Sequence, residues 1–144
     1  MKHQPYVAVG LVIAALSVFA GVVGALEARA ELPADAGDLS TATRTEVKDA
    51  SSQVLFSGQF GEVVQKGDER ERKAMLIGSG ASTCEAEIEI ESEAGGARQE
   101  LEVDVKGVAP GSSLTVSVDD RPLGSFRADA KGEGGLELSG AVGR

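Results

Sequence analysis

Two runs of strict alternation between acidic and apolar residues constrain the fold most strongly. In residues 85–91 every second residue is glutamate and the others are alanine or isoleucine, and residues 100–105 alternate acids with leucine and valine. A period of two places the apolar side chains on one face of a strand and the acidic ones on the other. Gly95-Gly96, between the runs, supplies the positive φ angles of a tight turn. The sequence therefore predicts a half-buried β-hairpin with one apolar and one acidic face.

The register of this hairpin brings acids opposite acids. A two-residue turn at Gly95-Gly96 places Ile90 opposite Leu101 and Glu91 opposite Glu100. Like charges directly opposite are unfavourable, yet a shift by two residues keeps them opposed, and a shift by one turns the apolar set to solvent. We interpret the resulting acidic ladder first as a solvated, self-repelling face that prevents edge-to-edge association. The alternative interpretation is a site for cations or for a basic partner.

Calcium is the cofactor that such a face would favour, because it binds through about six to eight oxygen ligands. Side chains on a flat strand face diverge, however, whereas calcium ligands must converge. The pair Asp119-Asp120 and the loop 129–133 are alternative acidic sites, but neither has the spacing of an EF-hand loop. The candidate ligands on the ladder are Glu87, Glu89, Glu91, Glu100, Glu102 and Asp104.

The N-terminal segment predicts export. Residues 7–26 carry no charge and follow a short polar start that contains Lys2. With Ala28-x-Ala30 this pattern is typical of a signal peptide cleaved after Ala30, and Val23-Gly24-Ala25 is a second cleavage candidate. The run is also long enough for a membrane-spanning helix, so an uncleaved signal anchor is the main alternative and a buried soluble helix a third. Cleaved or anchored, the rest of the chain is expected outside the cytoplasm, secreted or tethered by a single pass.

Composition divides the remainder into two parts. Residues 31–52 are rich in alanine, aspartate, serine and threonine, which is typical of a flexible linker. Residues 53–144 contain about seven short strand patterns separated by turn signals and no helix pattern, which predicts one all-β domain, an antiparallel sandwich or small barrel. Within it, the apolar residues 74–77 are expected to be covered on both faces. Residues 129–134 are expected to form a hairpin loop.

A resemblance narrows the fold class. Residues 108–118, VAPGSSLTVSV, resemble the Pro-Gly turn and following strand of fibronectin type III and other immunoglobulin-like modules. At the position of Leu114 those modules often carry a tyrosine whose hydroxyl group stabilises the corner, so this contact is absent here. Residues 124–132 resemble the closing hairpin of small exported bacterial β-sandwich proteins of unknown role. The resemblance implies an immunoglobulin-like sandwich, preceded by one N-terminal hydrophobic helix in residues 1–30, and it implies no catalytic residues.

The composition also excludes several chemistries. His3 is the only histidine, so Ser-His, Cys-His and histidine-metal sites are excluded beyond residue 30. The chain also has no tryptophan. Carboxylate pairs for glycoside hydrolysis remain open, but sugar sites usually present aromatic platforms. Cys84, the single cysteine, is expected to be a small buried residue, with an intermolecular disulfide as the alternative. We therefore do not expect an enzyme.

The formal net charge of −9 bears on partners. It argues against nucleic acid, whose phosphates require lysine and arginine, and against docking on anionic lipid. Two hypotheses of different classes follow. One is a non-enzymatic extracytoplasmic structural or interaction module with an acidic surface. The other is a calcium-responsive binding domain that uses the acidic hairpin face or the acidic loops.

Overall fold

The computed structural model describes residues 26–142, which form ten strands and one short 3-10 turn. No helix among these residues is long and apolar enough to cross a membrane. The hydrophobic helix predicted in residues 1–30 falls largely on residues 1–25, outside the described part. The elements are β1 (Leu26–Glu31), η1 (Leu39–Thr41), β2 (Arg44–Lys48), β3 (Val54–Gln59), β4 (Val64–Lys66), β5 (Glu69–Leu76), β6 (Thr83–Glu93), β7 (Gly96–Lys106), β8 (Ser113–Val118), β9 (Arg121–Arg127) and β10 (Glu133–Ala141).

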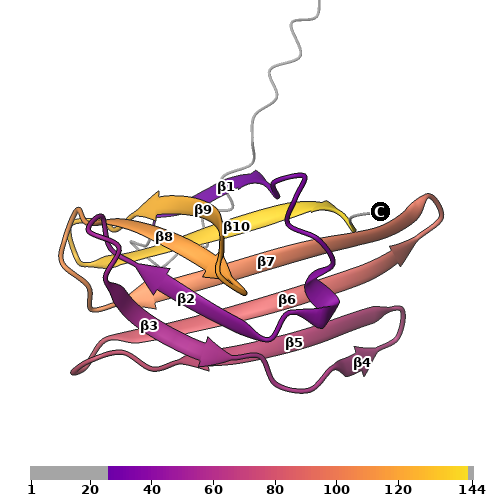
Figure 1. The fold of residues 1–144 in the computed structure, drawn as a ribbon, viewed down its shortest axis with the longest axis horizontal. Helices are drawn as coiled ribbons and strands as arrows, with labels where there is room; N and C mark the ends of the chain where they lie inside the picture. The colour runs from indigo at the N-terminus through magenta and orange to yellow at the C-terminus, as the bar shows by residue number, and fades with distance from the viewer. Residues whose placement is uncertain (1–25, 143–144) are drawn as a thin grey trace, which may run out of the picture.

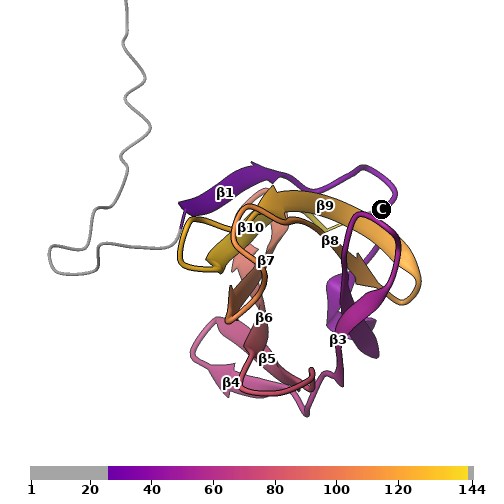
Figure 2. The same cartoon turned by 90° about the vertical axis from the view of Figure 1, so that its left-hand side faces the viewer.

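Two sheets pack face to face, which confirms the predicted all-β sandwich. The larger sheet has six strands in the order β1-β10-β7-β6-β5-β4, and the smaller has four in the order β3-β2-β8-β9. In Figure 1 the smaller sheet lies in front of the larger one. Figure 2, seen along the strands, shows both sheets curving around the space that the core side chains fill. Residues 53–142 contribute eight strands where about seven were predicted, and β1 and β2 add two strands before them.

The strand order follows from a four-stranded meander and from a β-hairpin that the chain forms in the other sheet. Strands β4 to β7 pair successively as antiparallel neighbours. The chain then crosses to the smaller sheet for the β8–β9 hairpin and returns as β10, which pairs antiparallel with β7. Strand β1 lies parallel to β10 on its other side. The hairpin loop predicted at residues 129–134 is therefore wrong, because this segment connects strands that belong to different sheets.

The inner faces of both sheets meet in one hydrophobic core. On one side of the sandwich β3 closes against β5: the Ser57 and Ile77 backbones exchange hydrogen bonds, and the Gly61 N–H donates to the Lys73 carbonyl at 2.8 Å. Fully buried side chains from both sheets fill the centre. They include Val47, Phe56, Ile88, Leu101, Val103, Val105, Leu114, Val116, Leu136 and Leu138.

The domain begins earlier in the chain than the sequence predicted. Strand β1 occupies residues 26–31, of which the prediction assigned 26–30 to the leader and Glu31 to the linker. Residues 31–52 also contain η1 and β2 rather than forming a flexible linker. Leu39 and Val47 are only 2% and 0% exposed. The physical reason is that β2 occupies a central position, paired with β3 on one side and with β8 on the other. Without β2, strand β3 would have no hydrogen-bonded neighbour in the smaller sheet.

The hairpin has the predicted faces but another register. Its apolar residues are buried and Ile88 lies opposite Leu101, whereas a turn at Gly95-Gly96 predicted Ile90 there. The turn instead uses Ala94-Gly95, and Gly96 follows with φ +130°. The difference is the two-residue shift that alternation permits, since it fixes which face is buried but not the pairing along it.

Residues 74–77 alternate instead of being covered on both faces. Ala74 and Leu76 are buried, but Met75 and Ile77 are 66% and 81% exposed. No layer covers the outer face of the six-stranded sheet within the described residues. The prediction of two-sided burial is therefore wrong at these positions.

Candidate functional site

The outer face of the six-stranded sheet gathers carboxylates from five strands, and we call it the acidic face. On the central strands β6 and β7, Glu89 lies opposite Glu100 and Glu87 opposite Glu102. The pattern of period two places them there, because burial of the intervening isoleucine, leucine and valine turns every acid outward. The carboxylates of the acidic face include Glu27, Glu31, Glu69, Glu71, Glu85, Glu87, Glu89, Glu91, Glu100, Glu102, Asp104 and Glu137.

The six predicted candidates therefore share one face, but not one ladder. Glu91 lies opposite Arg98 rather than opposite an acid, and Glu85 takes its place in the ladder opposite Asp104. The neighbours from β5, β10 and β1 were not predicted. Glu71 adjoins Glu89, and Glu137 adjoins Glu102, only because of the strand order. No local sequence pattern gives that order.

Cations neutralise the margins of the acidic face more than its centre. Lys73 contacts both Glu71 and Glu87, at 3.1 and 3.3 Å, and Lys66 contacts Glu71 at 2.6 Å. On the opposite margin Arg29 contacts Glu137 at 3.2 Å. Among the described residues, Glu89, Glu100 and Glu102 have no cation within 4.0 Å. The centre of the face thus carries uncompensated negative charge.

This crowding changes the acidity of the central carboxylates. A hydrogen bond with Glu87 is the main cause that raises the pKa of Glu89 to about 7, and partial burial and the charge of Glu69 add to it. Burial, followed by the charges of Asp104 and Glu27, raises the pKa of Glu102 to about 7. Burial also raises the pKa values of Glu100 and Asp104. Because the Glu102 and Asp104 side chains share a hydrogen bond, their pKa values belong to the pair rather than to either residue alone.

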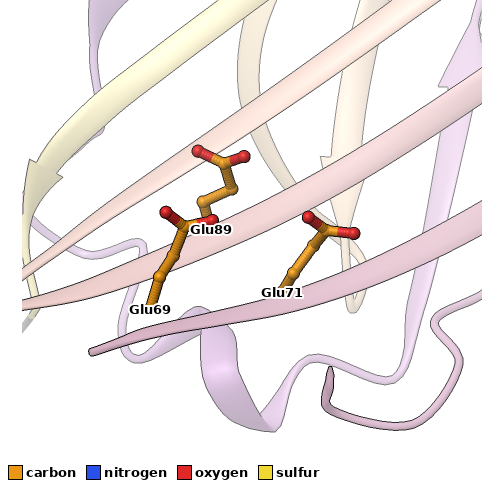
Figure 3. A group of neighbouring side chains, drawn as sticks. All are labelled: Glu69, Glu71 and Glu89. Carbon is orange, nitrogen blue, oxygen red and sulfur yellow. The ribbon is translucent and has the colours of Figure 1, made fainter. Parts of the chain in front are cut away.

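Three carboxylates on adjacent strands converge at one end of the face. Oxygen atoms of Glu69, Glu71 and Glu89 all lie within 4.8 Å of one another. Figure 3 shows the side chains rising from β5 and β6. Glu71 is already held by Lys66 and Lys73, and these contacts lower its pKa. The group offers three carboxylates, about half the oxygen ligands that calcium requires if each binds through one atom.

The other acidic candidates serve as turn anchors. The Asp119 carboxylate accepts hydrogen bonds from the Thr43 and Arg44 N–H groups, and the Asp129 carboxylate accepts from Lys131 and Glu133. Such contacts hold loops in place and leave fewer oxygen lone pairs for an ion. Neither of the two acidic loops therefore has a geometry that favours it over the sheet face.

Cys84 lies on the inner side of β6. It is 1% exposed, and burial raises the pKa of its thiol to about 12. The expected small buried residue is confirmed. A thiol of this kind stays protonated and out of reach of reagents in the folded domain, because the thiolate is the reactive form.

A comparison of the chain with known protein families, with curated proteins and with solved structures found no match.

Proposed function

We propose that the protein is a non-enzymatic interaction module, located outside the cytoplasm, whose acidic face binds a basic partner. The observation that carries the proposal is the centre of that face, where Glu89 lies opposite Glu100 and Glu87 opposite Glu102. Of these four carboxylates only Glu87 has a cation within 4.0 Å among the described residues, namely Lys73. Opposed like charges cost stability. A lysine- or arginine-rich segment laid across the strands would remove that cost and gain charge-assisted hydrogen bonds.

Location and class rest on sequence arguments. The uncharged run of residues 7–26 supports export, either as a cleaved signal or as an anchor. The absence of histidine beyond His3 supports a role without catalysis. The resemblance of residues 108–118 to immunoglobulin-like modules remains a prediction, and it agrees with this role because it implies no catalytic residues.

Titration with an oligolysine peptide tests the proposal. We expect binding that weakens as salt rises, because the contacts are exposed charge pairs. The triple change Glu87→Gln, Glu89→Gln and Glu102→Gln should weaken binding roughly tenfold, at about 0.5 kcal/mol for each exposed pair. Calorimetry at low and at physiological ionic strength measures both effects.

The matched control changes the net charge equally at exposed acids off the face. Asp35→Asn, Glu62→Gln and Asp120→Asn serve this purpose, since all three residues are exposed. This variant should keep most of the affinity. Equal weakening by both variants would show attraction to net charge alone. No binding by the parent protein would leave the acidic face as a solubilising surface.

Calcium binding is the second candidate, favoured by the convergence of Glu69, Glu71 and Glu89. Binding to the folded state alone raises the melting temperature by mass action. We expect micromolar to millimolar calcium to raise it, and Glu89→Gln to abolish the increase. An equal response to magnesium, or to sodium at matched ionic strength, would reduce the effect to screening and contradict this candidate.

A further inference from the structure

Strand β1 begins at the end of the uncharged N-terminal run. It pairs parallel with β10 from Leu26 opposite Gly134 to Glu31 opposite Ser139. The pairing continues one residue further, where the Leu32 N–H donates to the Ser139 carbonyl at 3.0 Å. Figure 1 shows β1 lying along β10 at the edge of the larger sheet. Leu26, the first residue of β1, is also the last residue of the uncharged run of residues 7–26.

Strand β1 contributes to the sandwich in three ways. Ala28 packs against the core, opposite the buried Leu136. Arg29 pairs with Glu137 on the acidic face at 3.2 Å. The β1 backbone also covers the hydrogen-bonding edge of β10, which would otherwise present a row of unpaired groups. A domain without β1 would have an open sheet edge and a gap beside Leu136.

The two cleavage sites that the sequence suggests differ in what they leave. A cut after Ala30 removes residues 26–30, five of the six residues of β1. A cut after Ala25 removes none of them. Ala25 supplies the small side chain required immediately before the cut, and Val23 occupies the position two residues before it. Only the second site releases a domain with all ten described strands.

We infer that the chain is processed at the Ala25–Leu26 peptide bond, so that Leu26 becomes the N-terminus and β1 stays in the domain. This inference rests on the proposed location outside the cytoplasm. The reaction is a hydrolysis by a membrane-bound signal endopeptidase that selects small side chains. Water adds across the amide, the C–N bond breaks, Ala25 keeps the carboxylate and Leu26 receives the proton on its new amine.

The test expresses the full chain with a C-terminal affinity tag in a bacterial host and measures the intact mass and N-terminal sequence of the recovered protein. We expect the mass to lack residues 1–25 and the sequence to start at Leu26. A start at Glu31 would overturn the inference. So would recovery of the uncut chain.

Paired variants identify the bond without disturbing the domain. Ala25→Gln places a bulky side chain before the proposed cut and should abolish the processed form. Ala30→Gln makes the same change before the rejected cut, at an exposed position of β1, and should be processed like the parent. The reverse pattern would assign the cut to Ala30 and contradict the inference.

Protease treatment of spheroplasts separates this inference from the proposed function. An uncut chain that added protease degrades lies outside the cytoplasm, so the processing site would be wrong while the location stands. An uncut chain that stays protected would contradict both. Protein that starts at Leu26 and is released with the periplasm supports both.

Discussion

At the scale of single residues, Gly58 sets how closely the two sheets approach. Strand β3 passes so near β5 that a Cβ atom at Gly58 would lie 2.7 Å from the Met75 carbonyl oxygen and 3.1 Å from the Leu76 Cα. Both are backbone atoms, so a side-chain rotamer change cannot relieve this contact at the seam, which is where β3 and β5 meet. We expect Gly58→Ala to lower the free energy of unfolding by about 1–3 kcal/mol, as overpacking does.

Gly61 provides the matched control for this seam. A Cβ atom there would lie 3.5 Å from the Lys73 carbonyl oxygen, an ordinary contact, and the Gly61 N–H bond to that oxygen is retained in alanine. Gly61→Ala should therefore change the free energy of unfolding by less than about 0.5 kcal/mol. Urea unfolding of both variants measures the difference. Equal effects would mean that the seam is not the tight contact.

Gln99 joins the N-terminal segment to the central strands. It is 1% exposed, its side-chain oxygen accepts from the Leu39 N–H at 2.9 Å, and its amide nitrogen donates to the Gly37 carbonyl at 2.7 Å. Gln99→Leu leaves both backbone groups without these partners. We expect a loss of about 2–3 kcal/mol in the free energy of unfolding and earlier proteolysis within residues 32–43. Gln59→Leu, at an exposed position, serves as the control, and equal losses would contradict the role of Gln99.

At the scale of elements, the sequence predicts those strands whose two faces meet different environments. The β6–β7 hairpin satisfies this condition, because its inner face is buried and its outer face is exposed. Strand β2 does not. Its buried residues Thr45, Glu46 and Val47 are consecutive, and Glu46 is held by Arg44 and Lys48, so no apolar alternation indicates a strand.

Strand β5 begins earlier in the chain than its apolar residues indicate, at Glu69 rather than near Ala74. Its first half, Glu69 to Arg72, contains only charged residues and would ordinarily be assigned to a loop. Arg72 nevertheless lies on the inner face of β5, with Ala74 and Leu76. Its guanidinium donates to the Gly61, Ser40 and Ala42 carbonyls. It also lies 5.7 Å from the centre of the Phe60 ring. An arginine can cover apolar surface and satisfy backbone carbonyls together. Composition alone does not reveal that use.

At the scale of the whole molecule, the acidic face depends on strand order. The sequence identified the acids of β6 and β7, since they share a local hairpin. It did not identify Glu71 or Glu137, because the pairing of β5 with β6 and of β10 with β7 is what places them beside Glu89 and Glu102. The pairing of β10 with β7 arises because the chain forms β8 and β9 in the smaller sheet before it returns to the larger one. Long-range topology of this kind is weakly encoded in local pattern.

The same strand order makes stability depend on pH. In the folded domain the pKa values of Glu89 and Glu102 are about 7, well above the usual carboxylate range, so the folded state binds protons more tightly than the unfolded chain. The stability that these two carboxyl groups contribute is fully present below the pKa they have in the unfolded chain. It is lost as pH rises through their pKa of about 7 in the folded domain. The charged groups that face them are Glu27, Glu69, Glu71, Glu87, Glu100, Asp104, Glu137, Lys73, Arg29 and Arg98.

We therefore expect the melting temperature to fall between ~pH 5 and ~pH 8, because like charge accumulates on the acidic face over that interval. Glu71, Asp49 and Asp129 have lowered pKa values and oppose this trend only at more acidic pH. Glu89→Gln combined with Glu102→Gln should flatten the decline, whereas Asp35→Asn combined with Glu62→Gln should leave it. Calorimetric scans at constant ionic strength measure the slope. A melting temperature that rises over this interval would show that the acidic face does not govern stability.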